Sequence, residues 1–235
     1  MPRLGPADVT FTTRDGGVSA PPYDSLNLAD HVGDDPCAVE ENRRRLARRT
    51  EHAPDDPTRW VWLRQVHGAR VVEADDATVS GAEADAAVTT RAGLPLAILV
   101  ADCVPVALAT ERAVGAVHAG WKGLEAGVIA NAVRALGPGD VHALLGPCIN
   151  PCHYAFGDDE LARLVARFGQ RVASRTVDGD AALDLPSAVT AALLDAGVAD
   201  VDRQTACTAH SPELFFSHRR DGVTGRQAMI VVKTT

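Results

Sequence analysis

Two hydrophobic patterns alternate along this chain. One is a near-continuous apolar run of strand length, which is typical of strands covered on both faces. It occupies residues 94–103, 113–120 and 141–149. The other pattern places apolar residues at helical spacing, and it occupies residues 124–136, 158–168 and 186–197. Strands that alternate with helices in this way predict an α/β fold, in which helices cover a layered sheet.

Both ends of the chain extend the same pattern. Residues 7–14 alternate like a half-buried strand, and residues 35–49 begin with Asp-Pro and continue at helical spacing. Residues 59–66 predict a strand that runs into a histidine, and residues 226–233 predict a final strand. The prolines and charges of residues 51–59 indicate a loop that is too short to establish two domains.

Length and composition limit the class of protein. A chain of 235 residues without repeats is long enough for one sizeable core. We therefore expect a single α/β domain over residues 1–235, with a mixed sheet covered by helices. Hydrophobic residues make up 46% of the chain and charged residues 23%, which excludes a disordered or fibrous protein.

Charge and hydropathy limit the location of the protein and the classes of partner that it can bind. The longest apolar run is broken at Pro95 and ends at Asp102, well short of the roughly 20 residues that a membrane span needs. The N-terminus lacks an apolar signal core, so we expect a cytoplasmic protein. The formal net charge of -8 argues against nucleic acid or an anionic membrane as the main partner, because both require a basic face.

Potential metal ligands gather where the predicted buried strands end. His67 and Cys103 each end a predicted strand, and His118 lies near the end of another. Two histidines and one cysteine form a zinc set with an open fourth position, which is the pattern of catalytic sites. Their spacing alone does not fix a site, because no pair has the short separation of a local metal motif. The competing interpretation is a buried thiol beside histidines that bond to backbone carbonyls.

Six longer stretches of the sequence are similar to one protein family. They are "SLNLADHVGDDP", "RQVHGARVV", "ADAAVTTRAGLPLAILVADCVP", "VGAVHAGWKGLEAGV", "LLGPCINPCHYAFG" and "FFSHRRDGVTGRQAMIVV". In this order they resemble the laccase-domain family, also described as multicopper polyphenol oxidase-like or purine nucleoside phosphorylase-like proteins. The resemblance covers nearly the whole chain and implies a single α/β domain with zinc ligands at His67, Cys103 and His118. The chain departs from the family at Ala155, where an acidic residue commonly stands, so a polar contact at this position is in doubt.

The resemblance also implies nucleoside chemistry. Members are described as phosphorylases of purine nucleosides and 5'-methylthioadenosine that also deaminate adenosine, and others carry the names laccase or peptidoglycan editing factor. We therefore expect a zinc-dependent phosphorylase of adenosine, inosine, guanosine and 5'-methylthioadenosine, with adenosine deaminase activity. Its partners would be these small nucleosides and inorganic phosphate.

Copper chemistry is the least favoured alternative. A multicopper oxidase needs a blue copper and a trinuclear cluster, hence many imidazoles, mostly in His-x-His pairs. This chain has eight histidines, and no two of them lie two residues apart. A blue copper site also commonly uses an axial methionine, and the chain contains only Met1 and Met229. Copper at the His-Cys-His set is therefore possible but less expected than zinc.

Deamination and phosphorolysis call for different residues. A zinc-bound water is suited to attack C6 of adenine. Asp102, beside Cys103, would either transfer protons or orient a ligand histidine. Phosphorolysis needs a clamp for phosphate, and guanidinium groups supply its bidentate geometry. Arg219, Arg220 and Arg226 are the candidates, with Arg226 preferred for its place after Thr-Gly.

Several other residues have two open interpretations. Ser25 and Asn27 would bind ribose or base edges, or Asn27 would cap a turn. His31 would line the pocket or hold a loop. Trp121 directly follows the predicted site, whereas the side chains of Trp60 and Trp62 fit a core.

The cysteines also allow more than one role. With five in a cytoplasmic chain, thiols or ligands are expected rather than disulfides. Cys148 and Cys152 resemble a metal pair, but buried thiols are favoured, and Cys207 is expected in the core. A different class of function would use Cys103 as a thiolate nucleophile with His118 as base, in an amide hydrolase that edits peptidoglycan precursors.

Overall fold

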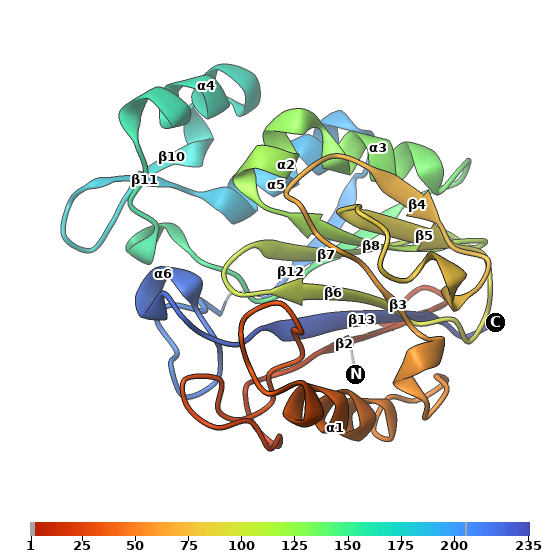
Figure 1. Cartoon of the computed structure of the whole chain (residues 1–235). Coiled ribbons are helices and arrows are strands. Elements are labelled where there is room, and N and C mark those ends of the chain that lie inside the picture. The colour runs from red at the N-terminus through yellow and green to blue at the C-terminus, as the bar shows by residue number, and fades with distance from the viewer. Residues whose placement is uncertain (1–2, 205) are drawn as a thin grey trace.

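The computed structural model describes residues 3–204 and 206–235, and its strands form two large mixed sheets and a small hairpin (Figure 1). The strands are β1 (Arg3–Leu4), β2 (Ala7–Phe11), β3 (Val61–Trp62), β4 (Val71–Glu73), β5 (Ala86–Thr89), β6 (Leu96–Val100), β7 (Val104–Ala109), β8 (Val114–Ala119), β9 (His142–Leu145), β10 (Ala173–Arg175), β11 (Ala181–Leu183), β12 (Asp200–Arg203) and β13 (Gln227–Lys233). One sheet has the order β1-β2-β13-β6-β3, and the other has the order β12-β9-β7-β8-β5-β4.

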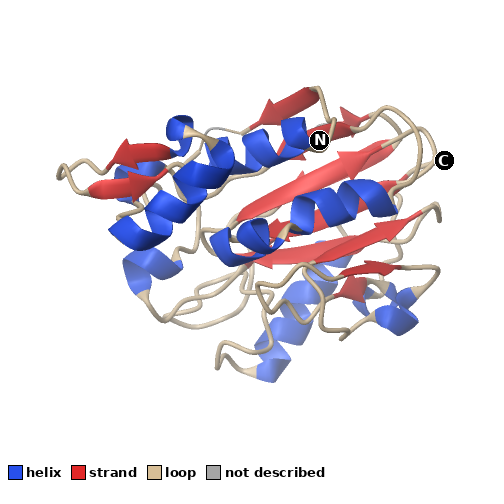
Figure 2. Ribbon diagram, turned by 90° about the horizontal axis from the view of Figure 1, so that it is seen from above, coloured by secondary structure: helices blue, strands red, loops and turns tan. Residues whose placement is uncertain are grey.

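Helices cover the outer faces of both sheets. The helices of the described residues are α1 (Pro36–Ala47), α2 (Trp121–Ala126), α3 (Val128–Ala135), α4 (Asp158–Phe168), α5 (Leu185–Asp195) and the short α6 (His218–Asp221), which has no buried residue. The 3₁₀ turns are η1 (Pro57–Arg59), η2 (Ala77–Val79), η3 (Pro151–His153) and η4 (Gln170–Val172). α1 packs against the five-stranded sheet, whereas α3 and α5 lie on the far side of the six-stranded sheet (Figure 1). Seen from above, helices lie across the strands (Figure 2). The result is a helix, sheet, sheet, helix arrangement. Among the described residues, no helix is long and apolar enough to cross a membrane.

The α/β class is confirmed, but the strands form two packed sheets instead of one. The reason lies in the alternation within β6. Leu96 and Ile98 pack into the cluster between the two sheets, whereas Ala97 and Leu99 pack toward α1. A strand that is apolar on both faces needs a cover on each side, and here the second sheet provides one of them.

Most predicted elements form close to their expected bounds, with two differences. The helix expected over residues 124–136 is divided into α2 and α3 by Gly127, whose φ of 94° is left-handed and ends the first helix. The strand expected over residues 59–66 is limited to Val61–Trp62. After β3 the chain leaves the sheet and forms the loop that carries His67, which itself has a left-handed φ of 58°.

The connection between β6 and β7 joins the two sheets. β6 belongs to the five-stranded sheet and β7 to the six-stranded sheet, so residues 101–103 pass from one to the other. Asp102 has a φ of 94° in this tight turn. Cys103 is therefore placed at the junction of the sheets, next to the end of β8.

Candidate metal and substrate site

Three predicted donors meet at this junction. One ligand atom from each of His67, Cys103 and His118 lies within 4.8 Å of the other two. The Cys103 Sγ is 3.8 Å from His67 Nε2, and the two imidazole rings meet edge to face with centroids 4.7 Å apart. Across a tetrahedral zinc ion, sulfur and nitrogen ligands lie about 3.6 Å apart. The donor spacing therefore suits one metal ion.

A buried carboxylate that the sequence analysis did not single out holds this set together. Asp85 is fully buried just before β5, and its Oδ1 lies 2.8 Å from His118 Nδ1. The same carboxylate accepts hydrogen bonds from the backbone N–H groups of Val66, His67 and Gly68, at 3.2, 2.9 and 2.7 Å. A carboxylate on Nδ1 leaves Nε2 of a histidine for a metal ion.

The site also perturbs its titratable groups. Burial opposes ionisation of Cys103, but the charge and hydrogen bonds of His118 and His67 outweigh it and lower the pKa of the thiol to about 6. Burial alone would lower the pKa of His118, but the Cys103 thiolate and Asp85 raise it to about 9. Burial also opposes ionisation of Asp85, yet hydrogen bonds from His118 and Gly68 lower its pKa. Without a metal ion, the geometry favours a thiolate and imidazolium pair.

The space beside the donors depends on a glycine. A Cβ added at Gly120 would lie 2.8 Å from Cδ2 of His67 and 3.1 Å from Sγ of Cys103. Because any larger residue would displace these ligands, the absence of a side chain at position 120 keeps the set in place. Soft thiolate and borderline imidazole donors are the ligands that zinc prefers. Both the spacing and the chemistry of the donors therefore fit the ion.

A cavity of about 470 Å³ opens above the donor set. This volume lies within the range of roughly 300–1,000 Å³ for small-molecule sites. Besides the three donors and Asp102, its walls include His31, which was expected either here or in a loop, together with Trp121. Trp60 and Trp62 do not line it; they stack against each other in the core, with ring centroids 5.8 Å apart.

The cavity wall also carries cationic side chains. Arg226 and Arg219 both line it, as the sequence analysis expected, and Lys122 joins them. Arg226 is held by hydrogen bonds from Nη1 to the carbonyls of residues 224 and 225. Arg219 donates from Nη1 to the carbonyl of Ala155 and lies over the ring of Tyr154. At position 155, where the side chain offers no polar group, the backbone thus provides the polar contact.

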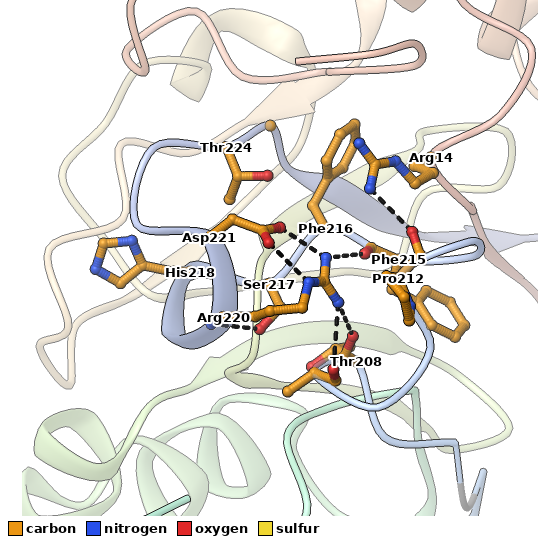
Figure 3. A network of polar contacts seen from close by, with 12 residues as sticks. Arg14, Thr208, Pro212, Phe215, Phe216, Ser217, His218, Arg220, Asp221 and Thr224 are labelled. Atoms are coloured by element: carbon orange, nitrogen blue, oxygen red, sulfur yellow. Dashed lines mark hydrogen bonds and ion pairs between the residues drawn. The ribbon is translucent and has the colours of Figure 1, made fainter. Parts of the chain in front are cut away.

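Arg220 has a structural role and does not line the cavity. Its guanidinium donates to the carbonyls of Thr208, Ala209 and Phe215 and pairs with Asp221 at 2.6 Å (Figure 3). Every one of these partners belongs to the protein, so Arg220 fixes the loop before α6. The expectation that Arg220 binds phosphate is not supported by this geometry.

Ser25 and Asn27 also lie away from the described wall of the cavity. The Ser25 hydroxyl accepts from Gly17 N–H and donates to the Arg14 carbonyl. Asn27 is fully buried, and its Oδ1 accepts the backbone N–H of Ala29, which is the turn cap that the sequence offered as the alternative to substrate binding. The same Oδ1 accepts the backbone N–H of Arg226. Asn27 therefore supports the arginine loop from behind.

Asp102 lines the cavity, but its hydrogen bonds differ from those expected. Its carboxylate accepts from the Thr208 hydroxyl at 2.7 Å and from the Arg219 N–H at 2.6 Å. The interpretation that Asp102 orients a ligand histidine is wrong, because Asp85 occupies that position. Asp85 stands directly before the small apolar residues of β5, and this position could have indicated a buried acid, although Glu83 lies two residues earlier. Lys122, Tyr154 and His218 gave no such signal.

A family model and named relatives match this chain over nearly its whole length. The family model described as multi-copper polyphenol oxidoreductase laccase matches residues 8–234. A relative from Corynebacterium glutamicum, named a purine nucleoside phosphorylase, is 42% identical in an alignment 240 residues long that covers 98% of this chain and 96% of the relative. Purine nucleoside phosphorylase YfiH of Escherichia coli K12 is 39% identical over 94% of this chain and 91% of its own.

Solved structures share the whole fold. A Neisseria meningitidis protein has a TM-score of 0.90 at 33% identity and covers 99% of this chain and 96% of its own. YlmD from Geobacillus stearothermophilus has a TM-score of 0.88 at 34% identity, with 97% and 92% covered. With the family model and the relatives matched over almost their full lengths, the chain belongs to the multi-copper polyphenol oxidoreductase laccase family.

Proposed function

We propose that this chain is a zinc-dependent purine nucleoside phosphorylase. The observation that carries the proposal is that one cavity combines the His67, Cys103 and His118 donors with the guanidinium groups of Arg219 and Arg226. The cavity can thus accept a small molecule, a metal ion and an anion together. Full-length relatives at 39–44% identity that are named purine nucleoside phosphorylases support the same conclusion.

Each part of the cavity has a role in this proposal. The half-buried indole of Trp121 offers a surface for a planar purine, whereas Arg219 lies over the ring of Tyr154. Arg226 and Lys122 bind inorganic phosphate, since a guanidinium gives bidentate hydrogen bonds and an ammonium adds charge. Zinc, when bound, would supply Lewis acidity and a water with a lowered pKa.

The finer expectations extend this proposal. Adenosine deamination would use the same donor set and water, with Asp102 on the cavity wall as the acid or base. We further propose 5'-methylthioadenosine, inosine and guanosine as substrates, and a cytoplasmic location. Zinc is favoured over copper because one thiolate with two imidazoles suits it. The eight histidines without a His-x-His pair do not fit a self-contained multicopper oxidase.

One arrangement favours a second candidate function. The site contains the three parts of a nucleophilic triad. Cys103 would be the nucleophile, His118 beside it the base, and Asp85 the carboxylate that orients the base. The lowered pKa of Cys103 and the raised pKa of His118 are those of an activated thiolate. This candidate is a cysteine amide hydrolase that acts on peptidoglycan precursors without a metal ion.

One experiment separates the two. The purified protein is incubated with adenosine, inosine, guanosine, 5'-methylthioadenosine or muramyl peptides, with and without phosphate and with and without a chelator. Release of free base and ribose 1-phosphate only when phosphate is present would support the phosphorylase. Base release independent of phosphate would contradict it, and metal-independent cleavage of an amide in a muramyl peptide would establish the hydrolase instead.

A further inference from the structure

A second group of thiol and imidazole donors lies outside the first cavity. Cys152 and His153 belong to η3, and Cys207 lies in the loop after β12. One ligand atom from each lies within 4.8 Å of the other two. The sulfur atoms of Cys152 and Cys207 are 3.9 Å apart, and His153 Nδ1 is 3.0 Å from the first and 3.9 Å from the second.

The two longer distances are close to those of ligands around one tetrahedral ion, whereas the 3.0 Å between Cys152 Sγ and His153 Nδ1 is shorter and is that of a hydrogen bond between the two side chains. With zinc–sulfur bonds of about 2.3 Å and zinc–nitrogen bonds of about 2.0 Å, two sulfur ligands lie roughly 3.8 Å apart and a sulfur and a nitrogen roughly 3.6 Å apart. An imidazole nitrogen directed at both sulfur atoms shows that these cysteines are not packed only as apolar groups. The sequence favoured buried thiols at Cys148 and Cys152 and a core position for Cys207; Cys207 is buried, whereas Cys152 is half-buried beside His153.

The surroundings suit a divalent cation. Cys207 is only 7% exposed, and its sulfur accepts the backbone N–H of Asn150 at 3.3 Å. Two thiolates would neutralise a divalent ion, so the site buries no net charge. The ring of His210 lies beside that of His153, with centroids 5.3 Å apart, so a further imidazole is close to the three donors. Cys152 also lines a small cavity of about 290 Å³, which offers an entry path.

We propose that Cys152, His153 and Cys207 bind a second divalent ion of the zinc type, distinct from the ion at His67, Cys103 and His118. The ion would cross-link η3 to the loop that contains Cys207. This inference does not rest on the proposed phosphorylase activity.

The second ion would also support the first cavity. Thr208 follows Cys207 directly and donates its hydroxyl hydrogen bond to Asp102, the neighbour of Cys103. Tyr154 follows η3 and lines the cavity. An ion that fixes both segments would therefore hold one wall of the cavity in place.

Cobalt spectroscopy in a Cys103→Ala background tests the proposal directly. This substitution removes the thiolate of the first set, so any thiolate-to-cobalt charge-transfer absorption must come from other cysteines. We expect Cys103→Ala protein to keep such a band when loaded with Co²⁺. The band should disappear when Cys152→Ser or Cys207→Ser is added, and it should survive the addition of Cys37→Ser, because Cys37 is exposed and outside both groups.

Zinc content provides a second measurement that does not require the Cys152→Ser and Cys207→Ser variants to fold. Wild-type protein should contain about two zinc ions per chain and Cys103→Ala protein at least one. A Cys103→Ala protein without a charge-transfer band would overturn the proposal. So would a Cys152–Cys207 disulfide in freshly purified wild-type protein that contains no second zinc ion.

Discussion

The Nδ1 of His118 lies 2.8 Å from the buried carboxylate of Asp85, and that carboxylate also accepts three backbone N–H groups from the loop that carries His67. One side chain therefore positions two of the three donors, although it lies outside the set itself. The left-handed φ of His67, 58°, is held by these backbone hydrogen bonds. Position 85 thus couples the orientation of an imidazole to the shape of a loop.

Asp85→Asn should weaken metal binding about 10- to 100-fold, because a carboxamide is a poorer partner for His118 and its NH₂ group opposes the loop N–H groups. It should also lower the free energy of unfolding by about 1–3 kcal/mol, since buried donors lose their acceptor. Competition with a fluorescent zinc chelator measures the first effect and denaturant unfolding the second. Asp200→Asn is the matched control, because Asp200 pairs with His142 at the exposed edge of the sheet; equal zinc affinities in the two variants would contradict this role.

Gly120→Ala should expel the metal ion while leaving the fold intact. The new Cβ would lie 2.8 Å from the His67 ring, which must move away from Cys103. Zinc content measured by mass spectrometry should fall to the level of the His67→Ala variant. The circular dichroism spectrum should stay that of the wild type. Full zinc retention would show that the His67 loop shifts without cost and that Gly120 does not shape the site.

Alkylation of Cys103 in metal-free protein should begin at a lower pH than alkylation of an ordinary cysteine. Its lowered pKa means that the reactive thiolate is populated above pH about 6, whereas an ordinary cysteine titrates at about 8.5. His118 remains an imidazolium up to pH about 9, so the ion pair persists between these values. Iodoacetamide labelling followed by peptide mass spectrometry should therefore show a midpoint near pH 6.

Two comparisons complete that experiment. Cys148 should react slowly at every pH, because burial raises the pKa of its thiol. Added zinc should protect Cys103 if the thiolate is a ligand. A labelling midpoint near that of an ordinary cysteine would show that the imidazoles do not stabilise the thiolate.

The sequence predicted the donors because their neighbours have strong patterns. Cys103 follows the apolar run of β6, and His118 lies at the end of the apolar run of β8, so both are fixed to strand ends. The crossing of residues 101–103 between sheets could not be predicted, because it depends on which buried strands pair. Periodicity reports that both faces of a strand are apolar, and it does not report whether a helix or a sheet covers them.

Side-chain roles outside the strands were harder to predict. Arg219, Arg220 and Arg226 belong to one short segment, yet only Arg219 and Arg226 line the cavity. Arg220 turns the other way because its guanidinium donates hydrogen bonds to the carbonyls of residues 208, 209 and 215. The positions of these carbonyls depend on how other loops fold, so the sequence around Arg220 does not predict them.

Arg226→Ala should reduce phosphorolysis about 10- to 100-fold, because a hydrogen bond to a charged group contributes roughly 1.5 to 3 kcal/mol. The loss should appear mainly as a raised KM for phosphate, with the KM for nucleoside and the zinc content unchanged. Arg226→Lys should recover part of the activity, since it restores the charge without the bidentate geometry. Arg175→Ala is the control, because Arg175 also donates to a nearby backbone carbonyl but is exposed and does not line the cavity. Adenosine deamination consumes water and should survive Arg226→Ala while failing in His118→Ala. Phosphorolysis that persists unchanged in Arg226→Ala would remove this arginine from the phosphate site and leave Arg219 and Lys122 as the cations able to bind the anion there.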